Sequence, residues 1–268
     1  MKEKLGNYIF QEEVGKDVAI DFALTNTDFN IHSFSGYDKN WKETIEEIFK
    51  KEPRIDGVFC SIECKNYIVK KYPYSTWIPH NNIMDWSCYS TVIPYNYLLN
   101  PDGIILPYGS IIKNVENIEK LFGNKIFIKP NSPWKAFTGF STSLDNLFYE
   151  LNSITQLEKV NKSELTLISS HKQIDNTEFR FWCINEEIIT YAPYTWQHNE
   201  VYSELPEDAI HFVYQILSYL YEYTDNGIVI DIVNTPNGLK LIELNALSTS
   251  GWYRGMDVDR LLKKLKEW

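Results

Sequence analysis

The chain has few of the residues that build disulfide frameworks or zinc sites. Its 268 residues include 4 cysteines and 5 histidines. Four cysteines do not form the disulfide scaffold of a secreted protein in a chain this long. Cys60 and Cys64 are close in sequence, but no second ligand pair follows them, and the histidines show no paired metal spacing. We therefore expect the cysteines to be core residues and do not expect a zinc site.

The sequence also lacks a long apolar run. No segment reaches the ~18 consecutive apolar residues that a membrane-spanning helix requires, and the first residues, 1–7, lack the apolar core of a signal peptide. We expect a cytoplasmic protein without a membrane partner. The net charge of −10 argues against nucleic acid as the main partner. It is compatible with ATP, because local lysines and a bound metal can reverse the field in one cleft.

What the sequence does contain is a mixture of helical and strand periodicities. Apolar residues with helical spacing predict helices near 41–49, 62–72, 115–122, 143–154, 207–223 and 257–268. In the fourth of these, the expected apolar stripe is Leu144, Leu147, Phe148, Leu151 and Ile154. Strands are expected near 57–60, 103–110, 125–130 and 165–170. Hairpins are expected at 178–191, turning near Asn185-Glu186, and at 227–245. This mixture predicts an α+β or α/β fold with several lobes.

The hairpin at 227–245 is the most informative segment. Two β-branched runs flank Pro236-Asn237-Gly238, which favours a type I turn closed by a left-handed glycine bulge. With that loop, Asp231 and Glu243 face each other, and Asn245 shares the face of Glu243. Two opposed carboxylates among apolar residues need a cation or a shared proton. Oxygen ligands favour Mg²⁺; a register one residue away would instead put both acids at a solvated edge.

Three basic residues precede this hairpin. Lys129 follows the strand Ile126-Phe127-Ile128, where it could meet a phosphate or extend along the strand end into solvent. Lys135 lies in an irregular loop that has no glycine before Gly139, so it is not a glycine-rich phosphate cradle. Arg180 shares one strand face with Glu178. Its planar fork suits phosphate or carboxylate oxygens, and an ion pair with Glu178 or with a neighbouring strand is equally compatible.

The order of these elements resembles the ATP-grasp fold, and most closely its R2K clade. The matching residues are Pro107–Ser110, Phe127–Pro130, Trp134–Gly139, Glu178–Arg180, Asp231, Glu243–Asn245 and Ser250-Gly251. The resemblance implies two α+β lobes that grip ATP, preceded by a small α/β lobe. The expected boundaries are 1–88 for the small lobe, 89–164 for the first ATP-grasp subdomain and 165–268 for the second.

The resemblance also implies roles for individual residues. The metal ligands for Mg²⁺ would be Asp231, Glu243 and Asn245. The residues that bind the ATP would be Lys129, Lys135, Thr138, Ser169, Ser170, His171, Glu178 and Arg180. The catalytic residues would be Arg180, Lys135 and Arg254, with Arg254 receiving a substrate carboxylate or, alternatively, lying in a polar turn. The family often has an acidic residue in the connector where this chain has Ser169 and Ser170.

The implied activity is ATP-dependent ligation of a carboxylate to an amine through an acyl phosphate, with release of ADP and phosphate. Phosphoryl transfer needs positioning and charge neutralisation, which lysines, an arginine and metal-bound carboxylates supply. The expected partners are ATP and a small amino acid or peptide, with a protein terminus as another candidate. Two alternatives stay open: a nucleotide-binding module without turnover, and a phosphotransferase with the same fold.

Overall fold

Two compact units make up the chain. The computed structural model describes residues 6–15, 28–73, 82–158, 160–175, 177–194, 204–223 and 227–267. Unit 1 comprises residues 1–81, 176–231 and 245–268, and unit 2 comprises residues 82–175 and 232–244. The three lobe boundaries expected from the sequence stay a prediction.

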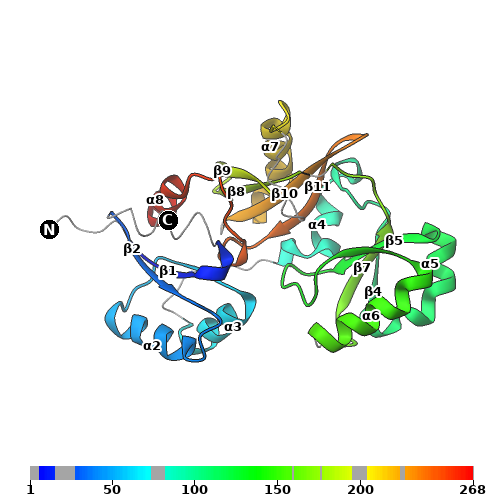
Figure 1. Ribbon diagram of the computed structural model, residues 1–268. Helices are drawn as coiled ribbons and strands as arrows, with labels where there is room; N and C mark the ends of the chain where they lie inside the picture. The colour runs from blue at the N-terminus through cyan, green and yellow to red at the C-terminus, as the bar shows by residue number, and fades with distance from the viewer. Residues whose placement is uncertain are drawn as a thin grey trace. The chain divides into compact units, whose positions relative to one another are not determined.

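Unit 1 begins with a parallel sheet of order β2-β1-β3. Its strands are β1 (Asn7–Gln11), β2 (Asn30–Phe34) and β3 (Gly57–Phe59), and its helices are α2 (Trp41–Lys51) and α3 (Ile62–Lys71). Strand β1 has apolar residues on both of its faces, because other elements pack against both faces of the sheet at this strand. Ile9 packs with the apolar residues of α2 and α3. Tyr8 and Phe10 pack with the helix α8 (Val258–Glu267), and Figure 1 shows these helices on opposite sides of β1 and β2.

The remaining elements of unit 1 include a twisted hairpin. Strands β8 (Glu178–Ile184) and β9 (Glu187–Tyr194) pair antiparallel. Asn185 and Glu186 have φ angles of 50° and 61°, the left-handed pair that a type I′ turn requires, so the turn predicted at these residues is confirmed. Helix α7 (Ala209–Leu220) follows. Helix α8 ends at Glu267; Trp268, the last residue of the predicted helix, lies outside the described residues.

Unit 2 contains an antiparallel sheet of order β4-β7-β5-β6. The elements are α4 (Trp86–Val92), β4 (Ile104–Pro107), α5 (Val115–Phe122), β5 (Lys125–Pro130), β6 (Phe140–Ser143), α6 (Leu144–Glu158) and β7 (Leu165–Ser170). Helices α5 and α6 lie beside this sheet (Figure 1). Leu147 and Leu151 of α6 are buried against Ile126, Ile128 and Ile168 of the sheet.

One residue of the predicted apolar stripe in α6 lies elsewhere. Phe148 is 64% exposed, whereas Leu147 and Leu151 are 0% and 4% exposed. The core contact follows the Leu144–Leu147–Leu151 row, and Phe148 lies about 100° further round the helix than Leu147. The apolar stripe predicted from the sequence spacing was therefore too wide, because it included Phe148.

The hairpin of β10 (Ile228–Thr235) and β11 (Gly238–Asn245) has the left-handed glycine that the sequence predicts. Gly238 has a φ angle of 83°. The full order of this sheet is β11-β10-β8-β9. The chain passes from unit 1 to unit 2 after Asp231 and returns before Asn245. No helix within the described ranges combines the length and apolar composition needed to cross a membrane.

Two leucines on α6 provide a test of this packing. We expect Leu151→Ala to lower the free energy of unfolding by about 2–5 kcal/mol, because it leaves a cavity in the core of unit 2. Leu157, on the same helix, is 78% exposed, and Leu157→Ala should change the stability by less than about 0.5 kcal/mol. Urea unfolding of both variants measures the difference; equal losses would contradict the packing.

Candidate functional site

A buried ion pair organises the polar residues of unit 1. The Arg180 guanidinium donates from Nε to Oδ1 of Asp231 over 2.7 Å and from Nη2 to Oδ2 over 2.6 Å. Asn245 donates from Nδ2 to the same Oδ2 over 2.9 Å. Asp231 is 0% exposed, and Arg180 and Asn245 are each 4% exposed. We call these three residues the Arg180 cluster.

The Arg180 cluster follows from the strand pattern. Residues alternate between faces along β8, so Phe179 and Phe181 occupy the face opposite to Arg180 and are themselves buried. The guanidinium lies 5.3 Å from the ring centroid of Tyr253. Among the partners that the sequence leaves open for Arg180, the structure has the ion pair with a neighbouring strand, since Asp231 is in β10. The cation that neutralises Asp231 is therefore an arginine.

Unit 2 contains a second charged group around Glu243. Lys129 Nζ lies 3.5 Å from Glu243 Oε2, and Lys135 Nζ lies 3.0 Å from Glu243 Oε1. Lys129 also donates to the carbonyl of Ile242 over 3.1 Å. The side chains of Lys129, Lys135 and Glu243 are 8%, 47% and 19% exposed. We call these residues the Glu243 cluster.

The loop after β5 brings Lys135 back toward Lys129. Gly139 makes this possible, because a Cβ atom there would lie 3.0 Å from the Cβ of Lys129. Lys135 itself has a φ angle of 36°, a left-handed value that is uncommon outside glycine and is found most often where a loop is held in a special conformation. The loop therefore places a half-exposed ammonium group beside a partly shielded carboxylate.

Strand β11 carries one member of each cluster. Glu243 and Asn245 are two residues apart in the same strand, so their side chains leave it on the same face. The predicted pairing of Asp231 with Glu243 across the hairpin stays a prediction. What the structure adds is that each carboxylate has its own protein cation.

The connector after β7 forms a third polar group, which contains an acid that sequence reasoning missed. Ser170 donates from its backbone N–H and from its hydroxyl to Asp102, and Lys172 Nζ lies 3.0 Å from Asp102. Partial burial raises the pKa of Asp102, but the bonds from Ser170 and Lys172 outweigh it and lower that pKa. Asp102 lies in the turn before β4 and brings a carboxylate to the connector, which has serines at 169 and 170. The sequence signal was the turn pattern Asn-Pro-Asp-Gly at 100–103.

Two other connector residues have local partners. Ser169 is fully buried and donates to Asn100 Oδ1 over 3.0 Å. His171 Nδ1 lies 2.9 Å from the hydroxyl of Ser141. Burial, and then the nearby Lys125, lower the pKa of His171, so its imidazole favours the neutral form.

The remaining predicted site residues lie outside these groups. Thr138 is exposed in the loop before β6, and Arg254 is exposed in the turn before α8. Glu178 is partly buried at the first position of β8. In the described part of the chain, no hydrogen bond or ion pair joins Thr138 to the Glu243 cluster, or Arg254 to the Arg180 cluster.

The donor atoms suit Mg²⁺ better than a soft metal. Carboxylate and amide oxygens are hard ligands, and no group of three or more His, Cys, Asp or Glu residues that could hold a metal occurs among the described residues. Glu243 is the partly accessible carboxylate of the set, whereas both oxygens of Asp231 accept hydrogen bonds in a fully buried position. A metal ion could therefore bind Glu243 by displacing its lysines, whereas Asp231 could bind one only if its buried hydrogen bonds rearrange.

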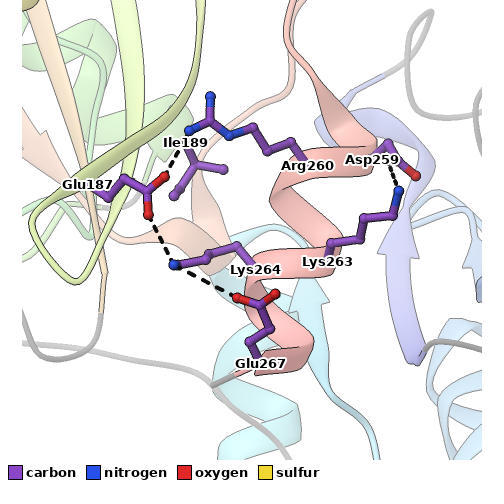
Figure 2. Close-up of a pocket in the computed structure, with 7 residues that line it drawn as sticks. All are labelled: Glu187, Ile189, Asp259, Arg260, Lys263, Lys264 and Glu267. Atoms are coloured by element: carbon purple, nitrogen blue, oxygen red, sulfur yellow. Dashed lines mark hydrogen bonds and ion pairs between the residues drawn. The ribbon is translucent and has the colours of Figure 1, made fainter.

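A separate hollow on unit 1 does not have the features of an active site. It has a volume of about 400 Å³ and lies against α8 and β9. Figure 2 shows Glu187 reaching Arg260 and Lys264 across it, at 2.8 Å and 3.0 Å. Lys263 pairs with Asp259 of the same helix. These charges neutralise one another at the surface. The residues around the hollow therefore form an ion-pair network that joins α8 to the β8–β9 hairpin.

Comparison with known families identifies the fold. The family described as ATP-grasp domain, R2K clade family 3, matches residues 103–265. The chain belongs to this family. The match includes every member of the Arg180 and Glu243 clusters, and it confirms the resemblance drawn from the order of motifs.

Solved structures extend the ATP-grasp likeness to nearly the whole chain. D-cycloserine synthetase DcsG aligns with a TM-score of 0.64 at 8% identity, covering 97% of this chain and 98% of that one. D-alanine–D-alanine ligase from Bacillus anthracis aligns with a TM-score of 0.56 at 14% identity, covering 97% and 94%. ATP-grasp ligase PsnB, complexed with precursor peptide PsnA2 and AMPPNP, aligns with a TM-score of 0.51 at 10% identity, covering 100% and 98%. A search of curated protein sequences found no match.

The buried ion pair of this R2K-clade chain predicts strong coupling between its partners. Arg180→Met should lower the free energy of unfolding by about 3–5 kcal/mol, because it leaves the Asp231 carboxylate buried without a cation. The double variant Arg180→Met/Asp231→Leu should lose much less than the sum of the two single variants. Urea unfolding of the four proteins gives the coupling energy; additive losses would show that the pair is not an energetic unit.

Proposed function

We propose that the chain is an ATP-dependent carboxylate–amine ligase. The observation that carries the proposal is the joint presence of two lysines, a buried arginine and the oxygen donors of β10 and β11 in the two clusters. A passive nucleotide binder has less use for a buried arginine held in one orientation by two further side chains. Phosphoryl transfer uses such fixed charge directly.

In the proposed reaction, an oxygen of the substrate carboxylate attacks the γ-phosphorus of ATP. The bond from that phosphorus to the bridging oxygen breaks, and ADP leaves. The nitrogen of the second substrate then attacks the carbonyl carbon of the acyl phosphate, phosphate leaves, and a proton passes from the nitrogen to solvent. The product is an amide or a peptide bond.

The residues of the Glu243 cluster have the charges for the phosphate end of ATP. Lys129 and Lys135 would each place an ammonium group against phosphate oxygens. Glu243 and Asn245 would hold Mg²⁺, with Asp231 beside them, and the bound ion would neutralise phosphate oxygens. In its absence, the Glu243 carboxylate offsets part of the positive charge of the two lysines and so reduces their mutual repulsion.

The other predicted residues complete the proposal. Arg180 would stabilise the charge that develops at the transferring phosphoryl group, and Arg254 would receive a substrate carboxylate. Ser170 and His171 would contact the nucleoside, with the buried Ser169 supporting the connector beneath them, and Thr138 and Glu178 would lie near the ATP. We add Asp102 to this set, because its carboxylate is oriented by Ser170 and Lys172. The four cysteines are free thiols, as a reducing compartment maintains, so we place the activity in the cytoplasm.

A two-substrate assay tests the reaction class. ADP release is measured with amino acids and short peptides as carboxylates, each with and without a second amine. The ligase proposal predicts release that needs both substrates and an amide product. Release with one substrate and a stable phosphorylated product would identify a phosphotransferase. Nucleotide binding without release under any pairing would identify a binding module.

Glu243→Gln should abolish detectable ADP release, a loss of at least about 100-fold, because it removes a charged metal ligand and the counter-ion of two lysines. Circular dichroism should show an intact fold, since Glu243 is partly exposed. The matched control is Glu187→Gln, which removes a surface glutamate paired with Arg260 and Lys264. Normal turnover in Glu243→Gln would defeat the proposed site.

Arg180→Lys separates charge from geometry. The ammonium keeps the positive charge but cannot bond both oxygens of Asp231 as the planar fork does. We expect kcat to fall by about 100-fold, measured by ADP release at saturating ATP. Arg260→Lys makes the same replacement in the surface network and should leave kcat unchanged. Near-normal kcat in Arg180→Lys would restrict Arg180 to a structural role.

A further inference from the structure

A second cavity lies at one end of the parallel sheet in unit 1. It has a volume of about 410 Å³, and its lining includes Gln11, Glu13, Gly36, Tyr37, Trp41 and Glu63. These residues come from the segments that follow β1 and β2 and from the start of α3 after β3. We call it the β1–β3 edge cavity.

Its position is the one where open parallel sheets bind ligands. All three strands run parallel, and the cavity opens at their carboxyl ends. In the order β2-β1-β3, β1 is the central strand. The next strand in sequence, β2, lies on one side of β1, and β3 lies on the other side. Crevices at the carboxyl ends of strands, where connections diverge in this way, are the general ligand sites of such sheets.

Side-chain bonds hold the rim of the cavity in place. Glu13 accepts hydrogen bonds from the hydroxyl of Ser35 over 2.5 Å and from the backbone N–H of Gly36 over 2.9 Å. Gln11 accepts from the backbone N–H of Ser61 over 2.8 Å. The approach is so close that a Cβ atom on Gly36 would lie 2.3 Å from Gln11 Nε2. The three segments therefore form one preorganised rim.

The charge of the cavity is negative. Glu13 and Glu63 both line it, and its described lining contains no lysine or arginine. Partial burial raises the pKa of Glu13, but hydrogen bonds from Ser35, Gly36 and Gln11 outweigh it and lower that pKa to about 2. Glu13 is therefore a carboxylate at any physiological pH, and the cavity attracts cations.

Aromatic rings provide the rest of the recognition surface. Tyr37 and Trp41 line the cavity, and aromatic faces attract ammonium groups. The Trp41 ring already does so within the chain, since Lys42 Nζ lies 5.3 Å from its centroid. Carboxylates beside aromatic rings are the combination that recognises an organic ammonium ion, whereas a bare metal ion would not use the rings.

The cavity is tied to the Arg180 cluster within unit 1. Trp252 donates its backbone N–H to the carbonyl of Val14, which lines the cavity, over 2.9 Å. The next residue, Tyr253, has its ring 5.3 Å from the Arg180 guanidinium. The Trp252 ring packs on Phe10 and Phe59 of the sheet, with centroids 4.8 Å and 4.6 Å away. One short loop thus spans from the cavity to the arginine.

We propose that the β1–β3 edge cavity binds the ammonium group of an amine-bearing substrate, with Glu13 and Glu63 as its counter-ions. The proposal rests on the ligase function proposed above and specifies its substrate class: a substrate that carries a primary ammonium group on a carbon framework that packs against Tyr37 and Trp41. This ammonium is a recognition group, and the unprotonated nitrogen that attacks the acyl phosphate is a separate atom. It gives the amino-terminal part of the chain the task of substrate selection.

Fluorine NMR of the protein labelled with 5-fluorotryptophan tests the proposal without turnover. The Trp41 resonance is assigned with Trp41→Phe. The probes are phenethylamine and butylamine, each compared with the corresponding alcohol. We expect the amines to shift the Trp41 resonance and the alcohols not to. Glu13→Gln should weaken amine binding by about tenfold or more, because it removes a charged partner.

Two further variants guard against a folding defect. Glu63→Gln changes an exposed residue of α3 and should also weaken amine binding, whereas Glu12→Gln, a neighbouring glutamate outside the lining, should not. Equal shifts with amines and alcohols, no Trp41 shift with either amine, or unchanged amine affinity in both Glu13→Gln and Glu63→Gln would overturn the proposal.

The ligase assay separates this proposal from the reaction on which it rests. If amines bind at Trp41 but no pairing of substrates releases ADP, the cavity stands and the ligase function fails. If ADP release requires a substrate that carries such an ammonium group and Glu13→Gln leaves the KM for that substrate unchanged, the ligase function stands and the cavity proposal fails. The expected result is a KM for that substrate at least about tenfold higher in Glu13→Gln, with the KM for ATP unchanged.

Discussion

Neutralisation of the carboxylates on β10 and β11 is the constraint on which the rest of the structure depends. A carboxylate that is shielded from water is tolerated only with a cation and hydrogen bonds around it. For Asp231 the cation is Arg180, and Asn245 adds a further hydrogen bond. Glu243 has Lys129 and Lys135 instead. These pairs fix the orientation of the arginine and the lysines. The same fixed charges are what a phosphoryl-transfer site needs before its ligand arrives.

Much of this arrangement could be predicted from the sequence, for identifiable reasons. The glycine bulge at Gly238 and the turn at Asn185–Glu186 follow from local backbone preferences, and the R2K-clade order of lysines, arginine and acids is a linear pattern. The partners of those charges were less accessible, because they depend on which strands are neighbours. The sequence left several partners open for Arg180, and the pair with Asp231 depends on the order of strands in the sheet. Asp102 was missed because a turn residue joins the connector through tertiary contacts alone.

The amino-terminal part of the chain gives the clearest gain from structure. Its sequence predicts a small α/β lobe but no chemistry. The fold brings the ends of three parallel strands together, and Glu13, Glu63, Tyr37 and Trp41 meet around one cavity, although they are up to 50 residues apart (Glu13 to Glu63). Helix α8 and the loop at Trp252 cover one face of this sheet, and α2 and α3 cover the opposite face. In the functions proposed here, substrate selection and phosphate chemistry use separate charged groups, negative at the cavity and positive at Lys129, Lys135 and Arg180.

Thermal melting with ATP, with and without Mg²⁺, measures whether Glu243 and its neighbours form a magnesium–nucleotide site. Saturating ATP with Mg²⁺ should raise the melting temperature of the wild-type chain by about 5 °C. The shift should be much smaller without the metal and should vanish in Glu243→Gln. No ATP-dependent shift in the wild type, or the same metal-dependent shift in Glu243→Gln, would contradict the assignment of these residues to a magnesium–nucleotide site.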